Sequence, residues 1–105
     1  MIEIQEYITP EGISPFAEWL LNLRDRTAKA KILSRLDRVA KGNFGDHKYL
    51  CEGIYELRLT YSKGIRIYYG KENNTIILLL SGGDKSSQTQ DIKKAIEYWH
   101  EHTGK

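Results

Sequence analysis

The sequence has only one cysteine, two prolines and no long apolar segment. Because Cys51 has no second cysteine to pair with, an internal disulfide is excluded, and a reducing compartment is expected. The longest apolar run, Ile76–Leu80, is far too short to cross a membrane, and no signal peptide opens the chain. We therefore expect a cytoplasmic protein that does not associate with a membrane.

Sequence patterns that mark common catalytic and cofactor sites are also absent. The chain has no GxxxxGK[ST] phosphate loop, no GxSxG nucleophile turn and no CxxC pair. His47, His100 and His102 do not make a metal-ligand set, and the last two point to different faces of a helix. We expect no metal and no cofactor, so any reaction would be metal-independent.

The composition is that of a single globular domain spanning residues 1–105. Hydrophobic residues make up 40% of the chain and charged residues 29%, and no Pro/Gly/Ser-rich linker divides it. The net charge of +2 conceals a basic stretch at residues 20–41. There, Lys31, Arg35 and Arg38 are expected on one helix face, either simply solvated or in contact with RNA phosphates.

The second half of the chain predicts three antiparallel strands. Apolar and polar side chains alternate in residues 54–61 and again in residues 65–69, which is the period of a strand with two unlike faces. Residues 75–80 are apolar on both faces, as in a central strand. Turn residues between these runs make each pair of neighbouring strands a hairpin.

The lengths of these turns predict a strand register. A three-residue turn containing Lys63 places Arg58 opposite Tyr68, and a turn at Asn73–Asn74 places Arg66 opposite Ser81. Both hairpins leave one face of the sheet apolar. The other face gathers Glu56, Arg58, Arg66, Tyr68 and Ser81, with Lys85 just beyond the last strand.

A first strand and two helices are expected before this sheet. Isoleucines alternate with polar residues over residues 2–8, which indicates the strand. Ser14, followed by proline, starts one helix, and Asp25 or Thr27 starts the next, which stops near Gly42. The two helices are expected to pack as a hairpin on the apolar face of the sheet.

The remaining segments complete an α+β fold. Residues 43–53 are expected to form a loop with at most a short extended piece at residues 47–50. Ser87 and Gln90 predict a capping box at the start of a C-terminal helix. The fold is thus an N-terminal strand and helix hairpin packed on a mainly antiparallel four-stranded sheet, with a C-terminal helix.

The apolar stripe of that last helix must be buried against the sheet. Its members are Ile92, Ala95, Ile96 and Trp99. Ile77 and Leu79 are the expected docking surface, on the same sheet face as the polar cluster.

Two long motifs resemble one protein family. They are GxYELRxxYxxGxRIYYG, from Gly53 to Gly70, and IxLLLxGGDKSSQxxDIxxAxEYW, from Ile76 to Trp99. Together with the helical half of the chain, they resemble the RelE/HigB class of bacterial and phage toxins, within the RelE/ParE superfamily. The nearest subgroup is the addiction-module killer proteins.

The resemblance implies both an activity and partners. Such toxins belong to type II toxin–antitoxin modules and cleave mRNA in the ribosomal decoding site. A cognate helix-turn-helix antitoxin, encoded beside the toxin, neutralises it in a hetero-oligomer. The expected function is therefore a metal-independent, ribosome-dependent mRNA endonuclease that inhibits translation.

The chemistry of RNA cleavage suggests roles for the polar cluster. Attack by the 2′-OH needs a base, a donor to the leaving oxygen and cations that stabilise the developing charge. Arg58 and Arg66 suit bidentate phosphate contacts. The resemblance adds Lys85, near the family's basic residue after the last strand, and Glu56, where some members have a glutamate proposed as general base.

The sequence departs from the family after the last strand, where many members have a catalytic Tyr or His. Here Ser86, Ser87, Gln88 and Asp91 follow instead. Tyr68 on the sheet, or Tyr98 and His100 on the last helix, are candidates for the missing acid or base. The residues expected to contact RNA are Lys31, Arg35, Arg38 and Lys63.

Two other functions remain open at this stage. One is a ParE-like toxin that inhibits DNA gyrase by binding, and the other is an inactive module that only binds an antitoxin. Arg66 beside Glu56 would then form a structural salt bridge. The convergence of Arg58, Arg66 and Lys85 on one face favours the nuclease, because a gyrase binder has no need for phosphate ligands.

Overall fold

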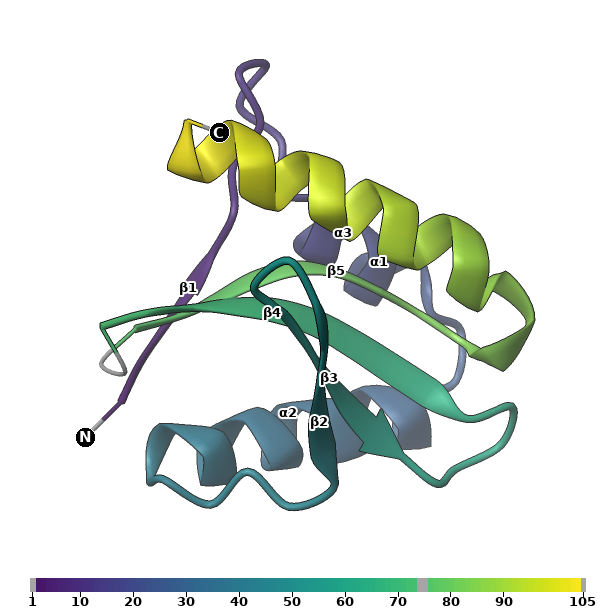
Figure 1. Cartoon of the computed structure of the whole chain (residues 1–105). Helices are drawn as coiled ribbons and strands as arrows, with labels where there is room; N and C mark the ends of the chain where they lie inside the picture. Colours follow the sequence, from purple (N-terminus) through teal and green to yellow (C-terminus); the bar gives the residue numbers. More distant parts are fainter. Residues whose placement is uncertain (1, 74–75, 105) are drawn as a thin grey trace.

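A computed structural model describes residues 2–73 and 76–104. Its elements are β1 (Glu3–Glu6), α1 (Pro15–Asn22), α2 (Arg26–Ala40), β2 (His47–Cys51), β3 (Ile54–Leu59), β4 (Ile65–Glu72), β5 (Ile76–Gly83), a 3₁₀ turn at Lys85–Ser87 and α3 (Gln88–Thr103). In the described part, the strands form one sheet in the order β1-β5-β4-β3-β2. The helices α1 and α2 cover one face and α3 the other, which confirms an α+β fold (Figure 1).

The sheet has five strands in the described residues, so the prediction of four is wrong. The additional strand, β2, pairs antiparallel with β3 at the edge of the sheet. Its sequence, HKYLC, is polar at the start, and edge strands tolerate such residues because one side faces water. At the other edge β1 runs parallel to β5, with Glu3 opposite Ile76, which makes the sheet mixed.

The predicted starts of α1 and α2 are confirmed. Ser14 Oγ accepts a hydrogen bond from the Ala17 amide at 3.0 Å, and proline occupies the first helical position. Asp25 Oδ1 caps α2 by accepting from two amides of its first turn. Gly42, at a φ of +92°, follows the end of α2, where a left-handed residue is needed.

The register of β3 and β4 differs from the prediction by two residues. Arg58 lies opposite Arg66, and Glu56 lies opposite Tyr68. The reason is a longer loop, residues 60–64, in which the Gly64 amide donates to the Tyr61 carbonyl at 3.0 Å. Because the shift is an even number of residues, every side chain keeps its predicted face.

The register of β4 and β5 also differs, because the ladder is irregular between Tyr68 and Tyr69. Arg66 lies opposite Gly83 rather than Ser81, which instead pairs with Tyr68. The predicted Asn73–Asn74 turn falls partly outside the described residues.

This irregularity reverses the expected facing of β5. Ile77 and Leu79 join the core beneath α1 and α2, whereas Leu78 and Leu80 face α3. The predicted docking of the last helix on Ile77 and Leu79 is therefore wrong. A strand that is apolar on both faces carries no alternation that could reveal such a one-residue slip.

The start of α3 also differs from the prediction. The capping box of Ser87 and Gln90 does not form, because Ser87 Oγ donates to Asp91 Oδ2 at 2.5 Å instead. Asp84 caps the preceding 3₁₀ turn by accepting from the Ser86 amide at 2.8 Å. In the part of the chain that the structure describes, no helix is long and apolar enough to span a membrane.

Candidate functional site

Three cationic side chains surround one hollow beside the β3–β4 loop. Lys63, Arg66 and Lys85 line it together with the loop backbone, and we call it the cationic groove. The Lys85 amide donates to the Lys63 carbonyl at 3.2 Å, which ties the end of β5 to the loop. A Cβ atom on Gly64 would lie 3.7 Å from Lys85 Cβ and 3.9 Å from Arg66 Nη1, so the three segments converge.

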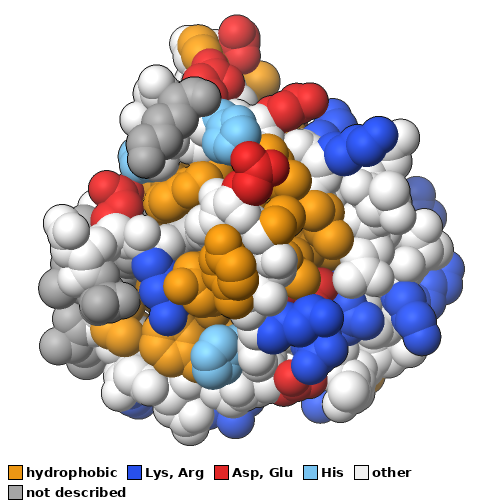
Figure 2. Space-filling view, viewed as in Figure 1, with side chains coloured by type: hydrophobic (Ala, Val, Ile, Leu, Met, Phe, Trp, Pro, Cys, Tyr) orange, Lys and Arg blue, Asp and Glu red, His pale blue; other side chains and the backbone are white. Residues whose placement is uncertain are grey.

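The groove forms part of a wider basic surface. Lys and Arg side chains gather on the right of the view in Figure 2, whereas hydrophobic side chains occupy its centre. The side chains of Lys63 and Lys85 are exposed. Such a surface attracts anions, and phosphates in particular.

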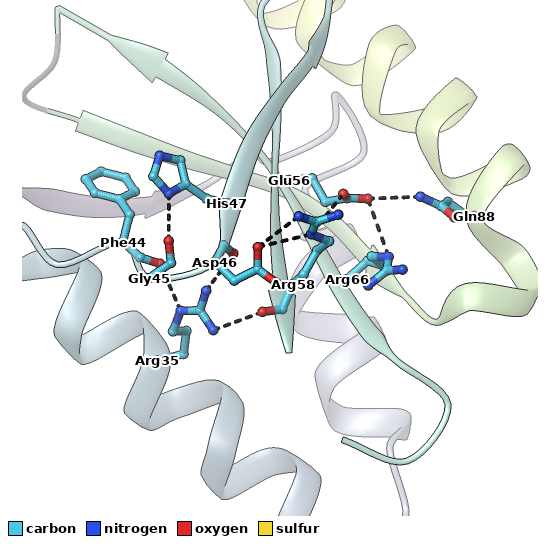
Figure 3. Close-up of polar contacts among 9 residues, drawn as sticks. All are labelled: Arg35, Phe44, Gly45, Asp46, His47, Glu56, Arg58, Arg66 and Gln88. Atoms are coloured by element: carbon cyan, nitrogen blue, oxygen red, sulfur yellow. Dashed lines mark hydrogen bonds and ion pairs between the residues drawn. The ribbon is translucent and has the colours of Figure 1, made fainter. Parts of the chain in front are cut away.

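Glu56 connects the groove to the interior of the protein. Its side chain is 0% exposed and lies between Arg66 and Arg58, as Figure 3 shows. Arg66 Nε is 3.5 Å from Glu56 Oε1, and Arg58 Nε is 4.0 Å from Glu56 Oε2. Gln88 Nε2, at the start of α3, donates to Glu56 Oε1 at 3.0 Å. The polar cluster expected from the sequence is therefore present, and so is the Arg66–Glu56 ion pair, which the sequence left open as a purely structural alternative.

Arg58 has a second carboxylate partner that the sequence did not suggest. Its Nε and Nη2 atoms donate to Asp46 Oδ1 at 3.2 Å and 2.9 Å. The side chain of Arg58 is 34% exposed and that of Arg66 is 15% exposed. Both guanidinium groups thus have partial access to solvent, and each already has a carboxylate partner.

Tyr68 shares this sheet face but not the groove. Its side chain is 0% exposed, in the core cluster beneath α3, and its hydroxyl has no hydrogen-bond partner among the described residues. Burial and the nearby charge of Glu56 raise the pKa of Tyr68 well above its ordinary value. The structure therefore gives substrate no direct path to this hydroxyl.

Tyr98 and His100 lie towards the far end of α3. At a rise of ~1.5 Å per residue, Tyr98 is roughly 15 Å along the helix axis from Gln88. The Tyr98 ring stacks on Tyr7 with centroids 5.1 Å apart, and His100 Nε2 is 3.1 Å from Glu52 Oε1. The expectation that either residue reaches the rim of the site is wrong, because α3 begins at the groove and runs away from it.

The predicted basic stripe of α2 is only partly exposed. Lys31 and Arg38 are exposed, and with Tyr61 they line a shallow hollow next to the β3–β4 loop. Arg35, in contrast, is 7% exposed. Its guanidinium donates to the carbonyls of Phe44 (2.9 Å), Arg58 (3.0 Å) and Asp46 (2.6 Å). Arg35 therefore fastens the loop before β2 to the sheet. Because it also borders the hollow lined by Lys31 and Arg38, its contact with RNA stays a prediction.

A metal site would need several acidic, histidine or cysteine side chains close together. Within residues 2–73 and 76–104, no three of these side chains are grouped so that they could hold a metal ion.

Comparison with known proteins identifies a relative of this chain. No family model matches the chain. An uncharacterized protein of Haemophilus influenzae (strain ATCC 51907 / DSM 11121 / KW20 / Rd) is 48% identical over 80 residues, which cover 76% of this chain and 81% of that protein. This chain belongs to the same family. The fold described above is therefore expected for the Haemophilus influenzae relative as well.

Proposed function

We propose that this protein is the toxin of a type II toxin–antitoxin module and resembles the RelE/HigB toxins. In this proposal it is a metal-independent endoribonuclease that cleaves mRNA on the ribosome and is neutralised by a cognate helix-turn-helix antitoxin. The observation that carries the proposal is the cationic groove, where Lys63, Arg66 and Lys85 converge on one hollow. The chain has a net charge of only +2, so a hollow lined by three cations is a local excess of positive charge. Such an excess favours the binding of an anionic ligand.

Each side chain of the groove has a role in the proposed reaction. Arg66 binds the scissile phosphate, and its ion pair with Glu56 holds the guanidinium in place. Lys63 and Lys85 stabilise the charge that develops on the phosphate oxygens, and the ammonium group of Lys85 donates a proton to the leaving 5′-oxygen. Because these contacts come from fixed cations, charge stabilisation needs no metal ion.

Glu56 is the proposed base. Its Oε2 atom accepts no hydrogen bond from the described residues, so it can still accept the 2′-OH proton. Because the carboxylate is buried and bonded to Gln88, the first turn of α3 must move for RNA to reach it. Ribosome-bound substrate would supply the contacts that favour this movement.

The exposed cations of α2 extend the proposed interface. Lys31 and Arg38 lie beside the β3–β4 loop, next to the groove. Contacts of this kind with ribosomal RNA phosphates supply affinity without sequence preference. The proposed setting is the bacterial cytoplasm, with the free toxin on ribosomes and the inhibited toxin in a hetero-oligomer with its antitoxin.

One observation favours a non-enzymatic function instead. Arg58 and Arg66 each form an ion pair with a carboxylate, and the negative charge of that carboxylate weakens the attraction of the guanidinium for a phosphate. A ParE-like inhibitor of DNA gyrase, or an inactive antitoxin-binding module, needs no free phosphate ligands. The exposed Lys63 and Lys85 still favour the nuclease.

The test is expression of the chain without its partner. Growth should arrest, and mRNA on ribosomes should be cut in the A site. Arg66→Ala should lower the cleavage rate by ~10²–10³, the usual cost of losing one charge-stabilising group. Lys41→Ala removes the same charge from an exposed pair on α2 and serves as the control. Intact mRNA with arrested DNA replication would instead identify a gyrase inhibitor.

A further inference from the structure

A second hollow adjoins the cationic groove and shares Ser62 and Lys63 with it. It holds about 160 Å³ of free space between α1, the start of α2 and the end of β5. Most of its wall is apolar and consists of Trp19, Leu23, Ala28 and Ile65. We call it the tryptophan pocket.

Two carboxylates border this pocket, and one of them has a free oxygen. Both oxygens of Asp25 are occupied, one by the amides of α2 and the other by the Tyr61 hydroxyl at 2.9 Å. Asp84 Oδ1 accepts from the amide and hydroxyl of Ser86, whereas Asp84 Oδ2 accepts no hydrogen bond from the described residues. Hydrogen bonds from Ser86 lower the pKa of Asp84, and the charge of Lys63 adds to this, so the carboxylate stays ionised near neutral pH.

We propose that the tryptophan pocket binds the base of one nucleotide of the substrate RNA and prefers a base with an amino group to uracil. This inference rests on the proposed function, because the phosphate of the same nucleotide would lie in the cationic groove. Lys63 borders both hollows and thus links the two subsites. A flat base next to an indole ring is a common arrangement in proteins that bind single-stranded RNA.

The free oxygen of Asp84 supplies the selectivity. A carboxylate accepts hydrogen bonds, and the amino groups of guanine, adenine and cytosine donate them. Uracil has a single N–H donor between two carbonyl oxygens, and these oxygens would repel the carboxylate. An aliphatic side chain fits the pocket less well than a base, because it would leave a charged oxygen desolvated and unpaired.

The two tryptophans of the chain allow a direct test. Trp19 lies in the pocket, whereas Trp99 packs on the opposite face of the sheet and is an internal control. The NMR signals of both indole N–H groups would be followed in the ribosome-free protein during titration with GMP, AMP, CMP, UMP and inorganic phosphate. The Trp19 signal should shift with the three amino-bearing nucleotides and stay fixed with phosphate, while the Trp99 signal stays fixed throughout.

A hydrogen bond to a charged group should make UMP bind roughly tenfold more weakly than the other nucleotides. Asp84→Asn keeps an acceptor for Ser86 and should remove this difference, because its amide can also donate to uracil. Lys85→Ala should weaken the binding of all four nucleotides alike and leave the ratios of their dissociation constants unchanged. Equal binding of UMP, or an unmoved Trp19 signal with every nucleotide, would overturn the inference.

The binding experiment is independent of cleavage, so failures of the two proposals can be told apart. If the protein cleaves mRNA on the ribosome without base preference, and Asp84→Asn changes nothing, the base-binding proposal is wrong and the nuclease proposal stands. Selective nucleotide binding by a chain that never cuts mRNA would overturn the nuclease proposal and leave an RNA-binding site.

Discussion

Arg58 and Arg66 lie directly opposite each other on neighbouring strands, and the carboxylate of Glu56 is within 4.0 Å of the first and 3.5 Å of the second. Like charges in opposed positions destabilise a sheet unless an anion compensates them. Glu56 supplies a negative charge that both arginines share, and Asp46 adds a second one for Arg58. The role of Glu56 in the proposed chemistry therefore adds to a structural role.

Glu56→Gln should lower the free energy of unfolding by about 1–3 kcal/mol, measured by urea denaturation. The substitution keeps the side-chain shape but leaves two partly buried guanidinium groups without their shared charge partner. Asp46→Asn, which weakens the more exposed pair with Arg58, is the matched control and should cost no more than ~1 kcal/mol. Equal effects of the two changes would show that Glu56 does not hold the pair together.

Tyr68→Phe should leave ribosome-dependent cleavage unchanged. The hydroxyl is buried without a hydrogen-bond partner among the described residues, so its removal should leave stability equal or raise it by up to ~1 kcal/mol. Cleavage rate and melting temperature of the purified variant would be measured together. A large loss of cleavage at unchanged stability would instead return Tyr68 to the list of catalytic residues.

Stability should decline at high pH because buried tyrosines resist ionisation. Burial, with the nearby charge of Glu101, raises the pKa of Tyr7 to about 12, and burial also raises that of Tyr69. A raised pKa means that the folded state holds the proton more tightly. The contribution of these tyrosines to the free energy of unfolding is complete below their unfolded-state pKa of about 10. It disappears as the pH rises towards their folded-state pKa.

The loss should appear in urea midpoints measured from about pH 9 to pH 12, together with tyrosinate absorbance. Tyr7→Phe should make the decline shallower, because one of the linked protons is then absent. A decline of unchanged steepness in this variant would show that Tyr7 is not one of the groups that control alkaline unfolding.

Arg35→Met should lower the free energy of unfolding by about 3 kcal/mol, roughly 1 kcal/mol for each of the three carbonyls that lose a donor. The long apolar stem is kept, so the change isolates the guanidinium. Arg38→Met, on the exposed face of the same helix, should change stability by less than ~0.5 kcal/mol. If the two variants unfold at the same denaturant concentration, the role assigned to Arg35 is wrong.

Alternation made the faces of β3 and β4 predictable from sequence. The apolar neighbours of Glu56, Arg58 and Arg66 in sequence predict one common face for the three, and the two-residue difference in register leaves that face unchanged. The N-cap residues of α1 and α2 are also predictable from sequence, since Ser14 and Asp25 each precede a stripe of apolar residues with helical spacing. Local patterns of this kind need no knowledge of distant contacts.

Other features of the fold and of the site depend on partners far away in sequence. Residues 47–51 form a strand only because β3 offers a free edge, and Arg35 looks like any exposed helical arginine until the loop before β2 folds against it. The roles of Asp46 and Gln88 in the polar cluster follow from contacts 12 and 32 residues away in sequence. The residues next to Asp46 and Gln88 in sequence form no pattern that would predict these contacts.

The parallel pairing of β1 with β5 has a consequence for biosynthesis. The first strand finds its partner only after nearly the whole chain has been made, since Glu3 pairs with Ile76. Lys85, which completes the cationic groove, follows β5 in the chain. Folding that depends on contacts so far apart in sequence is slow compared with folding through local contacts. A ribosome that translates this message therefore completes the cationic groove only after Lys85 has been added to the chain.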